Sequence, residues 1–117
     1  MALALNVYKT KVGIATTSLG EIYKAPVGYT GVVLLSNISN VSQDTQTVTL
    51  IHNRVTNVAG TISTTTTEFF EDFPIEPNDA FSAIKGKCCL EPGDSLKISV
   101  SNEDSVKYIF SILETLN

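Results

Sequence analysis

Hydrophobic and polar residues alternate along much of this chain with a period of two. The clearest stretch is residues 95–101, where Leu96, Ile98 and Val100 alternate with serine and lysine. A period of two places the apolar side chains on one face of a β-strand. No stretch keeps the 3.6-residue period of a substantial helix. The pattern therefore predicts a protein built from strands.

Turn residues separate the extended segments from one another. Pro26-Val27-Gly28 and Glu91-Pro92-Gly93-Asp94 both have the composition of tight turns. Residues 31–38 are apolar on both faces, as in a central strand. We expect an all-β fold with about eight short antiparallel strands in one domain of residues 1–117, a β-sandwich of jelly-roll-like type. The predicted core consists of Val33, Leu35, Leu50, Leu96, Ile98, Val100, Phe110 and Ile112.

For two segments, the expected structure is decided by local features of the sequence. Residues 1–11 are either an N-terminal arm, which would add a strand to a neighbouring copy and make Leu3, Leu5 and Val7 candidate interface residues, or an ordinary edge strand of the same domain. Residues 71–79 contain Pro74 and Pro77, so we expect a loop there.

Composition and charge exclude several classes of function. The net charge is −4, with only eight Lys and Arg residues in 117, so a nucleic-acid partner is not expected. One His and two Cys rule out most metal sites built from these residues, and we expect no metal and no cofactor. No apolar run approaches the ~18 residues of a membrane span, and the first residues lack the basic region of a signal peptide.

Few side chains are candidates for chemistry. His52 has no nucleophile motif to serve, so catalysis is not expected and the protein is predicted not to be an enzyme. Arg54, the one arginine, either pairs with a carboxylate across an interface or is solvated at a strand end. The aromatic residues Phe69, Phe70 and Phe73 either close one end of the core or form a surface for a partner.

Cys88 and Cys89 are adjacent in the sequence. On a strand their side chains would point to opposite faces, which disfavours a mutual disulfide. We expect two reduced thiols that the protein does not require; a redox or metal role is the alternative.

Two longer stretches carry a resemblance to a known group of proteins. The first is EIYKAPVGYT (residues 21–30), followed by an apolar strand and, at residues 47–50, TVTL. The second is GKCCLEPGDSLKI (residues 86–98), closed by residues 108–114. This pattern resembles small virion proteins of tailed bacteriophages, cyanophage-like ones in particular. Cys88-Cys89 replaces an apolar pair of that pattern, and the resemblance includes no catalytic residues.

The resemblance implies a non-enzymatic virion structural protein, a small multi-copy subunit that decorates or cements the capsid or joins the tail, neck or fibre apparatus. Its partners would be other virion proteins and copies of itself, its location the virion after synthesis in the host cytoplasm. The alternative is a carbohydrate- or receptor-binding β-sandwich module that presents Tyr23, Tyr29 or Tyr108. The absence of Trp counts against that alternative.

Overall fold

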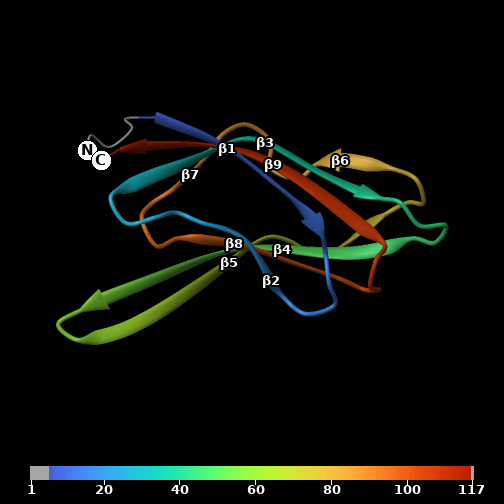
Figure 1. The fold of residues 1–117 in the computed structure, drawn as a ribbon. Helices are drawn as coiled ribbons and strands as arrows, with labels where there is room; N and C mark the ends of the chain where they lie inside the picture. Colours follow the sequence, from blue (N-terminus) through green and yellow to red (C-terminus); the bar gives the residue numbers. More distant parts are fainter. Residues whose placement is uncertain (1–5, 117) are drawn as a thin grey trace.

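The computed structural model describes residues 6–116 and contains two facing β-sheets (Figure 1). One sheet has the order β1-β9-β3-β6, with β7 also paired to β3, and the other has the order β2-β8-β4-β5. All pairs are antiparallel, which confirms the predicted all-β class. The strands are β1 (Asn6–Ile14), β2 (Gly20–Lys24), β3 (Tyr29–Asn40), β4 (Gln46–Val58), β5 (Thr61–Ile75), β6 (Ala80–Ser82), β7 (Cys88–Leu90), β8 (Ser95–Val100) and β9 (Val106–Leu116).

The strands pair in a nested order around the β4–β5 hairpin. Outside that hairpin β3 pairs with β6 and β7, then β2 with β8, and then β1 with β9. Successive pairs lie in alternate sheets. The short strands β6 and β7 share one position, because they pair with the two ends of β3. This arrangement is that of a double-sheet jelly roll, as the sequence predicts.

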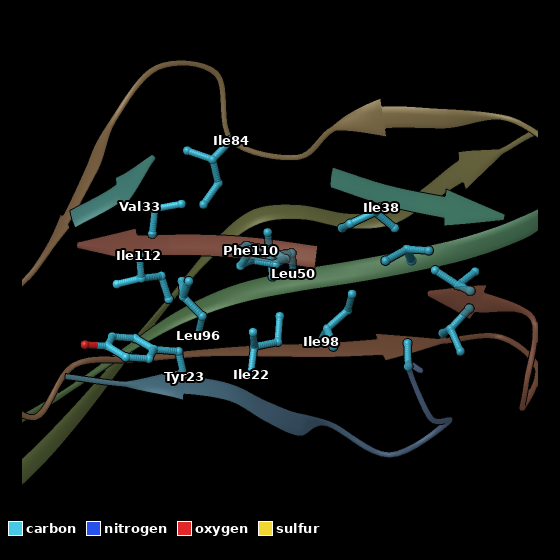
Figure 2. Packing of buried hydrophobic residues seen from close by; sticks show 14 of the residues in the cluster. Ile22, Tyr23, Val33, Ile38, Leu50, Ile84, Leu96, Ile98, Phe110 and Ile112 are labelled. Carbon is cyan, nitrogen blue, oxygen red and sulfur yellow. The ribbon is translucent and has the colours of Figure 1, made fainter. Parts of the chain in front are cut away.

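The core lies between the two sheets and is made from alternate residues of the strands (Figure 2). Leu96 and Ile98 of β8 face Phe110 and Ile112 of β9 across it, and all four are almost completely buried. Seven of the eight predicted core residues are buried: Val33, Leu50, Leu96, Ile98, Val100, Phe110 and Ile112.

Leu35 is the exception, and the prediction that it belongs to the core was wrong. Its side chain is 48% exposed. The β3–β9 register shifts between Val33 and Leu35, so β3 has one extra residue at this point. Such a bulge breaks the alternation of faces. As a result Leu34 and Leu35 both face outward, and Ser36 takes the inward position.

The predicted loop at residues 71–79 was also wrong in its first half, because β5 continues to Ile75. Pro74 is tolerated there since β5 lies at the edge of its sheet, where a missing N–H breaks no ladder. Asp72 adopts a φ of 49° beside a register shift, and its N–H donates to Thr49 Oγ1 at 3.0 Å. A bulge therefore takes up the irregularity without ending the strand.

For residues 6–11 the structure shows the edge-strand alternative. All nine residues of β1 are in register with β9, from Asn6 opposite Thr115 to Ile14 opposite Lys107. This segment is part of its own sheet, so removing it would uncover β9. Leu3 and Leu5 lie outside the described residues. An interface at Val7 stays a prediction.

A buried polar contact joins the two sheets. The Tyr23 hydroxyl of β2 donates to Glu114 Oε2 of β9 at 2.6 Å, and Lys9 Nζ lies 3.5 Å from the other carboxylate oxygen. Gly31, opposite Glu114, leaves the space for the tyrosine, because a Cβ there would lie 2.9 Å from the ring. Burial, and then the hydrogen bond to Glu114, raises the pKa of Tyr23. The contact fixes how β2 sits over β9.

The core assignment predicts different outcomes for one substitution at two sites. Ile98→Ala should lower the free energy of unfolding by about 2–5 kcal/mol, because it leaves a cavity between the sheets. Ile62→Ala is the matched control: Ile62 is 67% exposed, and the change should stay within about 0.5 kcal/mol. Denaturant unfolding measures both, and equal costs would contradict the placement of Ile98.

Candidate functional site

The outer half of the β4–β5 hairpin projects from the body of the molecule (Figure 1). The β4–β8 pairing ends at Asn53, whereas the β4–β5 pairing continues to Val58 opposite Thr61. Five residues of strand beyond Asn53 extend the hairpin by about 17 Å. Every residue in the range 55–69 is exposed. The projecting part is therefore a ribbon of two strands with neither face covered.

The local sequence explains the sharp reversal at the tip. Val58 and Thr61 are paired, so the loop is the two residues Ala59 and Gly60. Both have positive φ, 52° and 85°, as a type I′ hairpin turn requires. The Asn57 side chain accepts a hydrogen bond from the Gly60 N–H at 3.2 Å. A turn at residues 57–60 thus follows from the sequence. The sequence does not predict how far this turn projects from the body of the molecule.

Aromatic rings gather at the base of the same hairpin. The ring centroids of Phe70, Phe73 and Phe81 lie 5.0–5.5 Å apart. Phe70 and Phe81 pack against the core, whereas Phe69 and Phe73 remain 38% and 43% exposed. The rings line an open groove of about 430 Å³, which is completed by Ser82, Ala83 and Lys85.

The aromatic segment was expected either to close one end of the core or to form a surface for a partner, and its residues divide between buried and exposed positions. Phe70 extends the core toward its end, while Phe69 and Phe73 present apolar surface to solvent. Phe81 was not singled out in the sequence because β6 is only three residues long. A partner at Phe69, Phe70 and Phe73 stays a prediction.

Arg54 has partners within its own chain. Its Nε and Nη2 atoms donate to the two carboxylate oxygens of Asp94 at 3.0 and 2.7 Å, and Nη2 also lies 3.0 Å from Glu91 Oε2. Asp94 accepts further hydrogen bonds from the Glu91 N–H, and His52 Nε2 lies 3.1 Å from Oδ2. The cluster anchors the turn before β8 to the middle of β4. An additional contact of Arg54 with another chain stays a prediction.

The electrostatics of this cluster favour a charged carboxylate. Burial of Asp94 disfavours its ionised form, but hydrogen bonds from Arg54, from the Glu91 N–H and from His52 outweigh that effect. The pKa of Asp94 consequently lies below its ordinary value. In turn, the hydrogen bond and charge of Asp94 raise the pKa of Arg54 above the usual range. The arrangement is a structural clamp in which His52 lies beside a carboxylate.

The two cysteines lie on β7 as the alternation of faces predicts. Cys88 is half-buried and packs against the core, whereas Cys89 is exposed, and both are free thiols. Burial raises the pKa of Cys88.

The tyrosines proposed as sugar-contacting rings are not equally available. Tyr23 is buried, with its hydroxyl on Glu114, so the prediction that it is presented to a ligand was wrong. Tyr108 lies over Gly13 of β1, where a Cβ would meet the ring at 2.5–3.2 Å. Tyr29 is half-buried.

Two absences concern residues 6–116 alone. Within that range no group of three or more His, Cys, Asp or Glu side chains is placed to hold a metal ion. The same range includes no helix with the length and apolar character that crossing a membrane requires.

Comparison with known proteins gives similarity of fold. No family model matches the sequence, and no curated protein matches it. A chain from the crystal structure of the T13 IBDV viral particle is similar in structure, with a TM-score of 0.51 and 10% sequence identity. The match covers 97% of this chain and 32% of the viral chain, so this protein spans about a third of that chain's length.

A second solved structure has a lower similarity. It is a chain of Bacillus endospore appendages, which form a novel family of disulfide-linked pili; the TM-score is 0.47 and the identity 14%. The match covers 100% of this chain and 97% of that one. The viral likeness shows a shared fold, and the pilus likeness is too low to carry a conclusion.

The projecting ribbon is the feature that the sequence prediction missed. A signal for it exists in residues 61–67, where Ser and Thr occupy both faces of a strand almost without apolar residues. A strand with no apolar face has no core to cover. Together with the uncharged partner segment at residues 55–58 and a type I′ turn, this pattern indicates a ribbon outside the sandwich.

The Asp94 cluster predicts a specific pH dependence. Since the folded pKa of Asp94 is below the unfolded value of about 3.9, its stabilising effect is present above that pH and is lost as the pH falls through the folded pKa. Asp94→Asn should lower the free energy of unfolding at pH 7 by about 1–3 kcal/mol and by less at pH 3. The control is Asp104→Asn in an exposed turn. Denaturant unfolding at both pH values measures the difference, and an equal loss at both would contradict the assignment.

The placement of the thiols predicts their reactivity. Iodoacetamide should modify exposed Cys89 before half-buried Cys88, whose thiolate is disfavoured by burial. Mass spectrometry of the unreduced chain should find no Cys88–Cys89 disulfide, because neighbouring strand residues point to opposite faces. Detection of that bond, or equal modification rates, would contradict this description of β7.

Proposed function

We propose that this protein is a non-enzymatic structural subunit of a virion, present in many copies. The observation that carries the proposal is the jelly-roll order of the sheets, β1-β9-β3-β6 and β2-β8-β4-β5. Jelly rolls are common in viral capsid proteins, and a chain of the T13 IBDV particle shares this fold. Because one fold serves many functions, the proposal also needs support from the surface.

The surface supports an assembly role. The projecting ribbon exposes Val55, Val58 and Ile62, and the groove at its base exposes Phe69 and Phe73. Val55 and Ile62 lie on one face of the ribbon, and Phe69 and Phe73 line one groove. Exposed apolar side chains that are grouped in this way are used for contacts with other proteins. The buried core and the Tyr23–Glu114 contact join the two sheets, and the sandwich supplies a rigid body on which such contacts are held.

The motifs of residues 21–30 and 86–98 make the proposal more specific. They resemble small virion proteins of tailed bacteriophages, so we place the subunit on such a particle, where it decorates or cements the capsid or joins the tail, neck or fibre apparatus. Its partners would be other virion proteins and further copies of itself.

Labelling of native particles tests this function. An antibody raised against the folded chain should label purified virions in negative-stain images at a repeated position, either on the capsid shell or at the tail. The same antibody preabsorbed with the purified chain is the control. Particles that carry no label, although the chain is present in the infected cell, would contradict the proposal.

A carbohydrate- or receptor-binding module is the second candidate. The groove of about 430 Å³ favours it, because a phenylalanine-lined depression can accept an apolar face of a ligand. A glycan array probed with the chain distinguishes the candidates. Binding that Phe73→Ala abolishes would support the module, and an array without signal beside labelled virions would support the structural subunit.

A further inference from the structure

The edges of the two sheets differ in how well they are protected against pairing with another strand. Edge strands expose unpaired N–H and C=O groups, and proteins block them with lysine, with bulges or by keeping them short. β1 carries Lys9 and Lys11, and β2 carries Glu21 and Lys24 and has a bulge. β6 and β7 have only three residues each. These edges all have a recognised form of protection.

The edge of β5 at residues 61–67 has none of these protections. Its sequence is TISTTTT, without charge, proline or glycine, and the register with β4 is regular there. The run without charge is longer still, from Val55 through Thr67. Among the described residues β5 pairs only with β4, so its outer side is open to another strand. Threonine and isoleucine also favour the extended conformation that pairing requires.

We propose that this edge pairs with the same edge of a second copy. The two strands are antiparallel, and a two-fold axis passes midway between Thr64 of one copy and Thr64 of the other. In this register Thr61 lies opposite Thr67, Ile62 opposite Thr66, and Ser63 opposite Thr65. Every pair is neutral, and threonine pairs across strands are favourable. Glu68, the first charged residue beyond the run, lies opposite Gly60, so no like charges meet. Pairing of two β1 edges about Thr10 would instead set Lys9 against Lys11.

The register of the β4–β5 hairpin gives a second reason to expect that the partner of this edge is a copy of the same chain. Val55 lies opposite Thr64 and Asn57 opposite Ile62, so Val55 and Ile62 occupy the same face of the ribbon. The two-fold pairing gathers these residues from both copies on one face of a four-stranded sheet. A free two-stranded ribbon is only marginally stable in water, and pairing with a second ribbon would stabilise it by forming a four-stranded sheet. This contact rests on the proposed function and names one interface of the assembly.

Cross-linking tests the register directly. The tests use a Cys88→Ala, Cys89→Ser chain, which leaves no native thiol. Thr64→Cys places two thiols across the axis on strands whose Cα atoms are about 4.5–5.5 Å apart, within the range that a disulfide spans. Mild oxidation should convert most of this variant to a covalent dimer. Thr61→Cys is the matched control, because it faces Thr67 of the second copy and should stay largely monomeric.

A second variant tests the contact without any new thiol. Thr64→Lys sets two lysines opposite each other and should weaken self-association at least about tenfold in sedimentation velocity. Thr10→Lys on β1 should leave association unchanged, and circular dichroism should show the native fold in both. Equal cross-linking of Thr64→Cys and Thr61→Cys, or unchanged association of Thr64→Lys, would overturn β5 pairing.

Sedimentation of the unmodified chain separates the two hypotheses. Assembly that continues while Thr64→Cys fails to cross-link would overturn the β5 contact and leave the proposed structural role standing. A single-chain mass at every concentration, together with virions that carry no antibody label, would overturn both.

Discussion

The constraint on which the rest of the structure depends is the nested pairing of the chain around one hairpin. Because β4 and β5 pair first in this order, β3 must meet β6 and β7, β2 must meet β8, and β1 must meet β9. Each further pair lies in the other sheet, so rolling up this long hairpin creates the sandwich and its core together. A change of register in one pair therefore shifts the faces of its neighbours as well.

Local alternation was enough to predict most of the core but not its irregularities. Ile98 and Phe110 lie on strands without a bulge, so a period of two assigns them correctly. Leu35 follows an extra residue in β3, which turns Ser36 inward. The Ser36 side chain then forms hydrogen bonds with the backbone of Ile84, 48 residues away, and this contact is visible only in three dimensions. Nothing near Leu35 in the sequence encodes that partner.

The candidate site shows the same division between local and distant information. The turn at Ala59-Gly60 and the extended form of residues 61–67 follow from local chemistry. Phe81 joins Phe70 and Phe73 only because β6 returns along β3, and Asp94 reaches Arg54 only because β8 pairs with β4. Such contacts are set by topology, which a single sequence does not specify.

The position of the hairpin in the topology separates the part of β4 that builds the core from the part that is exposed. The inner half of β4 lies between β8 and β5 and contributes Val48 and Leu50 to the core. The outer half begins where β8 ends, so it adds no buried side chain and its sequence is not constrained by packing. Residues 55–67 are therefore exposed and can contact other chains without any change in the core. An uncharged, β-branched edge is a template for pairing with another strand, and here it is carried by a rigid body whose stability does not depend on it.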